Sequence, residues 1–327
     1  YFLDHLFTDR KVMAKTKHPD ATVMISGVTR ELFPLLSNIL PSGFEALVAP
    51  GVYTTVESAR ALDTLAPFQE DSLNAYFWLT LQGDSMSVLP QLPSSSVYQS
   101  LQAMQQYGLD GYMVRYWTLG DLVPTTSYLA RASWDLTDPE SFYREHLSAI
   151  CGREAVEDVI RAFDTVDEAT RFLAQRRHGK WIIYGNPMPG LLEEHYHVET
   201  ADYPELDKAL AIYRRALDHL RRASDRSTDQ GKDYLGYFIG RSEMAIDYLR
   251  LLQTIRELGV AFGEGQQARG RRDPAKVLKK RLEVKELAAQ SVKLARSAVA
   301  HFAGVVRDES DRGMLLSLNN VLCRHAK

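Results

Sequence analysis

Hydrophobic residues in the first part of the chain occur in short, nearly continuous runs, separated by segments with helical periodicity. Such runs are typical of parallel strands that are covered on both faces. The four runs are ATVMISG (Ala21–Gly27), FEALVAP (Phe44–Pro50), NAYFWLTLQG (Asn74–Gly83) and GYMVRYW (Gly111–Trp117). The segments between them predict helices over Arg30–Leu40, Thr55–Ala66 and Ser96–Tyr107. The order predicts repeated strand–helix units.

After Trp134 the pattern becomes helical throughout. Asp138 and Pro139 form a helix start signal, with a capping side chain followed by proline in the first turn. Longer helices are predicted over Glu154–Ala174, Pro204–Ser224, Gly231–Leu258 and Pro274–Arg307. In the third of these, apolar residues recur every three or four positions, which predicts a buried stripe. Its members are Met244, Tyr248, Leu251, Leu252, Ile255 and Leu258.

Four strand–helix units correspond to half of a (β/α)8 barrel. We therefore predict an α/β fold in which residues 1–135 form the C-terminal half of such a barrel and residues 136–327 form an α-helical domain. An open four-stranded parallel sheet would expose an apolar edge, so an upstream segment or a companion chain is expected to complete the barrel. A flavodoxin-like sheet needs phosphate-binding glycines after its first strand, and only Gly27 occurs there.

Composition narrows the classes of partner. The 327 residues carry a formal net charge of -3, which predicts no general attraction to nucleic acid or to anionic membrane. The basic run Ala268–Arg281 is interpreted as a helix start capped by Asp273, and no apolar run is long enough to span a membrane. Cys151 and Cys323 have no metal-ligand spacing. Because the chain begins at Tyr1 rather than methionine, its localisation is left open.

Candidate chemistry follows the predicted strands, since functional residues of βα barrels lie at the carboxyl ends of strands. Asp84 and Asp121 are the candidate catalytic carboxylates, with a helix cap or a turn as their alternative roles. The candidate substrate-binding residues are Tyr53, Arg115, Tyr116 and Trp117. Aromatic rings can pack on the C–H faces of a sugar, and charged groups can hold its hydroxyls. Arg115 needs a partner if it is buried, and Asp84 is expected to supply it; Trp78 is expected in the core.

No metal or cofactor is predicted. His195 and His197 could face one side of a strand, but no third ligand is evident. The glycine-containing segment Gly259–Gly270 does not follow a strand and so does not fit a dinucleotide site.

The stretch GYMVRYWTLGDLVPTTSYLARASWD (Gly111–Asp135) resembles the last barrel strand of several glycoside hydrolase families, where it leads into a helical C-terminal domain. Asp138–Val156 and Asp308–Leu322 are also similar, and the nearest resemblance is to α-glucuronidase-like and hexosaminidase-like barrels. The resemblance implies an exo-acting glycoside hydrolase, or the C-terminal part of one, that acts on a carbohydrate substrate through two carboxyl groups. In many such enzymes the acid/base carboxylate follows the fourth barrel strand, which would here lie upstream or on another chain.

Two functions are therefore carried forward. In the first, the chain hydrolyses a glycosidic bond, and Arg115 suits a carboxylated sugar such as a uronic acid, because a guanidinium can bind a carboxylate through two hydrogen bonds. In the second, it is a non-catalytic glycan-binding or assembly module that completes the fold of a partner.

Overall fold

The computed structural model describes residues 23–28, 44–48, 56, 59, 61–66, 75–83, 88–116, 118–175 and 195–322. The chain separates into two compact units, each described by itself. The first, the sheet unit, comprises residues 1–81 and 95–115, and the second, the helical unit, comprises residues 82–94 and 116–327. The helix predicted over Arg30–Leu40 lies outside the described residues. Of the helix predicted over Thr55–Ala66, the structure describes residues 56, 59 and 61–66.

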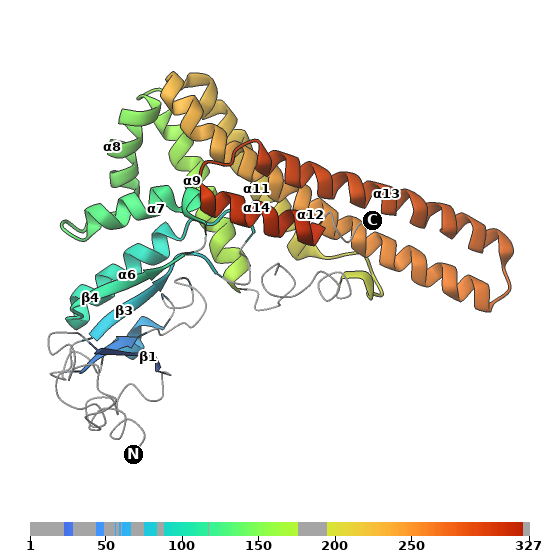
Figure 1. Ribbon diagram of the computed structural model, residues 1–327, viewed down its shortest axis with the longest axis horizontal. Helices are drawn as coiled ribbons and strands as arrows, with labels where there is room; N and C mark the ends of the chain where they lie inside the picture. The colour runs from blue at the N-terminus through green and yellow to red at the C-terminus, as the bar shows by residue number, and fades with distance from the viewer. Residues whose placement is uncertain are drawn as a thin grey trace, which may run out of the picture. The chain divides into compact units, whose positions relative to one another are not determined.

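The sheet unit contains four parallel strands in the order β1-β2-β3-β4. They are β1 (Val23–Val28), β2 (Phe44–Val48), β3 (Ala75–Thr80) and β4 (Gly111–Arg115). Strands β2, β3 and β4 lie inside the predicted runs, and β1 ends one residue beyond its run. A short 3-10 helix, η2 (Leu62–Leu65), precedes β3, and α6 (Ser94–Tyr107) leads to β4 (Figure 1). In β3, Ala75, Phe77 and Leu79 are buried, as expected for the covered face of a sheet.

The helical unit contains the longest elements of the described chain (Figure 1). Its helices are α7 (Leu119–Ala132), α8 (Pro139–Cys151), α9 (Val156–Gln175), α11 (Pro204–Arg226), α12 (Asp229–Gly270), α13 (Pro274–Ala303) and α14 (Glu309–Leu322). Helix α11 packs on α9 and α12, and α12 packs along α13. None of the helices in the described ranges combines the length and apolar character that a membrane span requires.

Local signals explain where several of these helices begin. The Asp138 carboxylate accepts a hydrogen bond from the Ser141 N–H at 2.9 Å, and Pro139 is the first residue of α8, as predicted. Asp273 caps α13 in the same way, through the Lys276 N–H at 3.0 Å. A cap of this kind satisfies one of the backbone donors that a helix start leaves unpaired.

The predicted partial barrel is wrong, because the described chain is mostly helical rather than an α/β barrel. Most of its buried apolar residues lie on helices that pack against one another. The described residues contain no strand after β4, so helix–helix packing rather than further strand–helix units builds most of the core. The strand patterns were therefore identified correctly, but they describe the smaller part of the architecture.

Candidate functional site

One face of the β3–β4 pair carries aromatic and charged side chains. Trp78 pairs with Met113 and Thr80 pairs with Arg115 in the parallel register, so these four side chains share a face. The Arg115 guanidinium lies 5.7 Å from the centroid of the Trp78 ring, which is within cation–π range. Met113 is 48% exposed and Trp78 and Arg115 are half-buried, so solvent reaches this face.

The same face continues toward β2. Tyr76 pairs with Gly111, and a Cβ added at Gly111 would lie 3.2 Å from the Tyr76 ring. Glu45 on β2 raises the pKa of the Tyr76 phenol by its negative charge, and burial and the charge of Asp110 raise it further. Glu45 is half-buried, and one of its carboxylate oxygens has no hydrogen-bond partner among the described residues. We call Glu45, Tyr76, Trp78, Met113 and Arg115 the sheet face.

The Trp78 indole N–H is buried and finds no acceptor among the described residues. An unpaired buried donor is unfavourable, and a bound ligand with a hydroxyl or carboxylate could supply the missing acceptor. Glu45 and Trp78 were not among the predicted site residues. Glu45 could have been found as a charged residue inside an otherwise apolar strand. Trp78 could have been found as a tryptophan two positions before the end of its strand.

Three of the predicted site residues, Tyr53, Asp84 and Trp117, lie outside the described residues. The expected pairing of Arg115 with Asp84 therefore stays a prediction. Arg115 is the last residue of β4, and Tyr116, which follows it, is 44% exposed.

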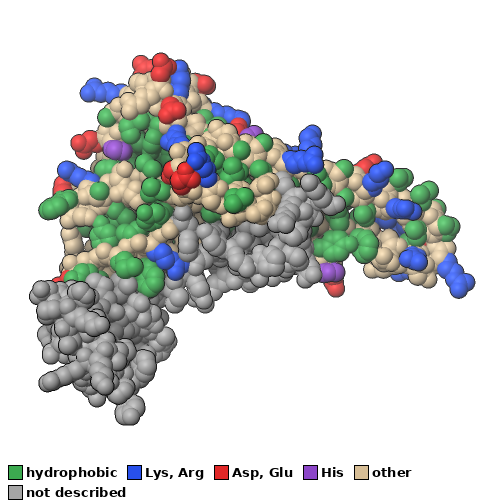
Figure 2. Space-filling model, in the orientation of Figure 1, with side chains coloured by type: hydrophobic (Ala, Val, Ile, Leu, Met, Phe, Trp, Pro, Cys, Tyr) green, Lys and Arg blue, Asp and Glu red, His purple; other side chains and the backbone are tan. Residues whose placement is uncertain are grey.

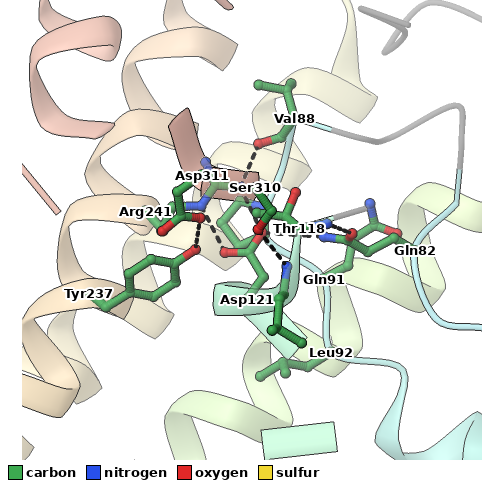
Figure 3. Close-up of polar contacts among 12 residues, drawn as sticks. Gln82, Val88, Gln91, Leu92, Thr118, Asp121, Tyr237, Arg241, Ser310 and Asp311 are labelled. Atoms are coloured by element: carbon green, nitrogen blue, oxygen red, sulfur yellow. Dashed lines mark hydrogen bonds and ion pairs between the residues drawn. The ribbon is translucent and has the colours of Figure 1, made fainter. Parts of the chain in front are cut away.

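Asp121 belongs to the helical unit, where it lies in the first turn of α7 and is 1% exposed. Arg241 of α12, which is 0% exposed, donates from Nε to one carboxylate oxygen at 2.7 Å and from an Nη to the other at 2.6 Å (Figure 3). Gln82 donates to the same carboxylate at 3.4 Å, and its own carbonyl accepts the Thr118 N–H at 2.6 Å. Asp121 is therefore held as one partner of a buried ion pair.

The surroundings of Arg241 reinforce this arrangement. Its guanidinium also donates to the Val88 carbonyl at 3.0 Å and lies 4.2 Å from the Phe302 ring centroid. Nearby, the Tyr237 hydroxyl donates to Asp311 at 2.9 Å (Figure 3). Burial raises the pKa of the Tyr237 phenol, and the negative charge of Asp121 raises it further, so this phenol stays protonated. The network joins α7, α12, α14 and the segment before α6.

The cavity next to Asp121 is small. It is lined by Asp121, Gln91, Ser242 and apolar side chains, and its volume of about 10 Å³ is close to the minimum that holds one water molecule. A sugar ring does not fit there, so Asp121 as placed does not contact such a substrate. The described residues contain no group of three or more histidine, cysteine or acidic side chains placed to hold a metal ion.

A comparison of the sequence with known protein families finds no matching family model, and a comparison with curated proteins finds no match.

Proposed function

We propose that the chain is a carbohydrate-active protein, an exo-acting glycoside hydrolase or the C-terminal part of one, and that its sheet face binds the sugar. The proposal is carried by one observation: the Arg115 guanidinium and the Trp78 ring lie 5.7 Å apart on a face that solvent reaches. The Trp78 ring can stack on the apolar side of a pyranose while the Arg115 guanidinium binds an oxygen of the same sugar. An acidic sugar such as a uronic acid suits Arg115 best.

Two carboxylates are the candidates for the bond-breaking step. Asp84 is proposed from the sequence alone, and Glu45 is proposed because it lies on the sheet face, where it is half-buried beside the Tyr76 phenol. Partial burial and a neighbouring phenol are the kind of environment in which a carboxyl group can act as a general acid or base. Asp121 takes no part in this proposal, since both of its oxygens are bound by Arg241.

Binding is tested by titrating the chain with neutral and uronic acid monosaccharides and their aryl glycosides, using calorimetry. Arg115→Ala is expected to weaken binding of the uronic acid by about tenfold or more, the range of a lost charged hydrogen bond, and Trp78→Ala is expected to weaken binding of both classes. The matched controls are Arg131→Ala and Trp134→Ala, which change an exposed arginine and a 92% exposed tryptophan of the helical unit. If the two sheet variants bind as the controls do, the sheet face is not the sugar site.

Turnover separates the enzyme from a non-catalytic module. The aryl glycosides are assayed with the chain alone and with any upstream segment or companion chain. Glu45→Gln or Asp84→Asn is expected to reduce hydrolysis by about 10²–10⁴-fold while leaving sugar affinity nearly unchanged. Binding without turnover in every combination would instead favour the glycan-binding or assembly module.

A further inference from the structure

Helices α12 and α13 form a long antiparallel hairpin whose far end, residues 262–286, we call the arm tip (Figure 1). Arg272 takes the left-handed conformation in the turn, with φ of 57°, and the Asp273 N–H donates to the Ala268 carbonyl at 3.0 Å. The Lys280 side chain is only 15% exposed, and its ammonium lies 2.6 Å from the Glu264 carboxylate and 2.8 Å from the Glu283 carboxylate. The arm tip is thus held together by its own contacts.

Two leucines point away from this hairpin. Leu278 and Leu282 are 61% and 55% exposed, and their spacing of four residues places them side by side on α13. The helix contacts α12 through its other side, where Lys280 lies between the glutamates. The two leucines therefore contribute little to the hairpin and form an apolar strip that it leaves uncovered.

Basic side chains surround this strip. The arm tip contains eight cationic residues, namely Arg269, Arg271, Arg272, Lys276, Lys279, Lys280, Arg281 and Lys285, against the four acidic residues Glu264, Asp273, Glu283 and Glu286. The tip is therefore net positive in a chain of formal net charge -3. Figure 2 shows Lys and Arg side chains along the α12–α13 hairpin beside hydrophobic side chains.

Charge and shape select among occupants of the strip. A second copy of the chain would bring a like positive tip, and such juxtapositions are unfavourable. Nucleic acid would use the cations but would gain little from the leucines. An anionic membrane would need a broader apolar face, whereas α13 has its other side packed on α12. An acidic amphipathic helix matches both features, with carboxylates for the cations and apolar residues for the leucines.

We propose that the arm tip is a docking site for an acidic amphipathic helix of a partner protein, with Leu278 and Leu282 as the apolar contacts and the surrounding lysines and arginines as the charge contacts. Binding then combines an apolar centre with a charged rim, so its association rate falls as salt rises. This proposal is independent of the sugar site, because the arm lies in the helical unit and the sheet face lies in the sheet unit.

The test is fluorescence anisotropy with a labelled, glutamate-rich helical peptide that carries leucines at helical spacing, with its sequence-scrambled version as the comparison. We expect the helical peptide to bind the full chain. L278S/L282S and, separately, K279E/R281E should each weaken binding by about tenfold or more, the factor for loss of about 1.4 kcal/mol. The matched control is Leu316→Ser on α14, a leucine that is also 61% exposed. Circular dichroism and thermal melting verify that each variant is folded.

Four results would overturn the proposal. The peptide could fail to bind the wild-type chain, or it could bind L278S/L282S as well as it binds Leu316→Ser. A DNA duplex or phosphatidylserine vesicles could bind through the arm tip while the peptide does not. Sedimentation could show that the chain self-associates through Leu278 and Leu282. Each of these outcomes leaves the sugar titrations unaffected, so failure here and failure of the proposed function are distinguishable.

Discussion

Arg241 and Asp121 lie 120 positions apart in the sequence and meet through two hydrogen bonds of 2.7 and 2.6 Å inside the helical unit. Removing one partner leaves the other charge buried without compensation. We therefore expect Arg241→Met and Asp121→Asn each to lower the free energy of unfolding by about 3–5 kcal/mol, measured by urea denaturation.

The double variant Arg241→Met/Asp121→Leu should lose much less than the two single losses added together, because it leaves no unpaired charge. The exposed pair between Arg131 and Asp135, at 3.3 Å, is the control, and Arg131→Ala should change stability by less than about 1 kcal/mol. Single variants as stable as Arg131→Ala would contradict the structural role of the buried pair.

Two glycines of α12 should respond in opposite ways to alanine. A Cβ at Gly259 would lie 2.0 Å from the Tyr196 carbonyl oxygen, whereas a Cβ at Gly263 meets nothing within 4 Å. Gly263→Ala should therefore stabilise the protein by about 0.5–1 kcal/mol, since alanine favours a helix. Gly259→Ala should lower the melting temperature, because backbone must move to make room. A rise in melting temperature for both variants would show that the Tyr196 backbone does not approach α12 this closely.

The cap of α8 should make part of the stability depend on acid pH. Hydrogen bonds from Ser141 hold the pKa of Asp138 below its ordinary value of 3.8. Because the folded pKa is lowered, the contribution is fully present above the unfolded value and is lost as pH falls through the folded value. Asp138→Ala should cost about 1 kcal/mol at neutral pH, and this difference should shrink in strong acid. Thermal melts of both proteins across this range measure it, and a difference independent of pH would contradict the charged cap.

Cys151 should be chemically quiet in the folded protein. Burial raises the pKa of its thiol to about 11, so little thiolate exists near neutral pH. In a Cys323→Ser background, we expect iodoacetamide to label Cys151 much more slowly in buffer than in concentrated urea, as followed by mass spectrometry. Equal labelling rates would mean that α8 opens readily.

Local patterns accounted for much of the secondary structure and for little of the tertiary structure. Pro139 and Pro274 marked their helix starts correctly because caps and first-turn prolines act within a few residues. Helix α12 was predicted to end at Leu258 but continues to Gly270, because pairing with α13 outweighs the low helix propensity of its glycines.

The candidate site shows where such patterns stop being informative. Asp121 has the same local sequence whether it faces a pocket or a buried arginine, and its partner Arg241 lies on a distant helix. A signal for Arg241 was present, since it precedes Met244 by three positions and so lies on the apolar stripe of α12. Trp78 was expected in the core, whereas the structure leaves it half-buried, with the Arg115 guanidinium 5.7 Å from its ring centroid.

Helix α12 has one mechanical consequence. Its 42 residues form a single uninterrupted rod of about 60 Å, at 1.5 Å per residue. The buried Arg241 guanidinium, which is bound to Asp121, lies in the first third of this rod. The turn that leads into α13 and its exposed leucines lies at the other end. A force on the arm tip therefore bends α12 toward its other end, where the ion pair between Arg241 and Asp121 resists the movement.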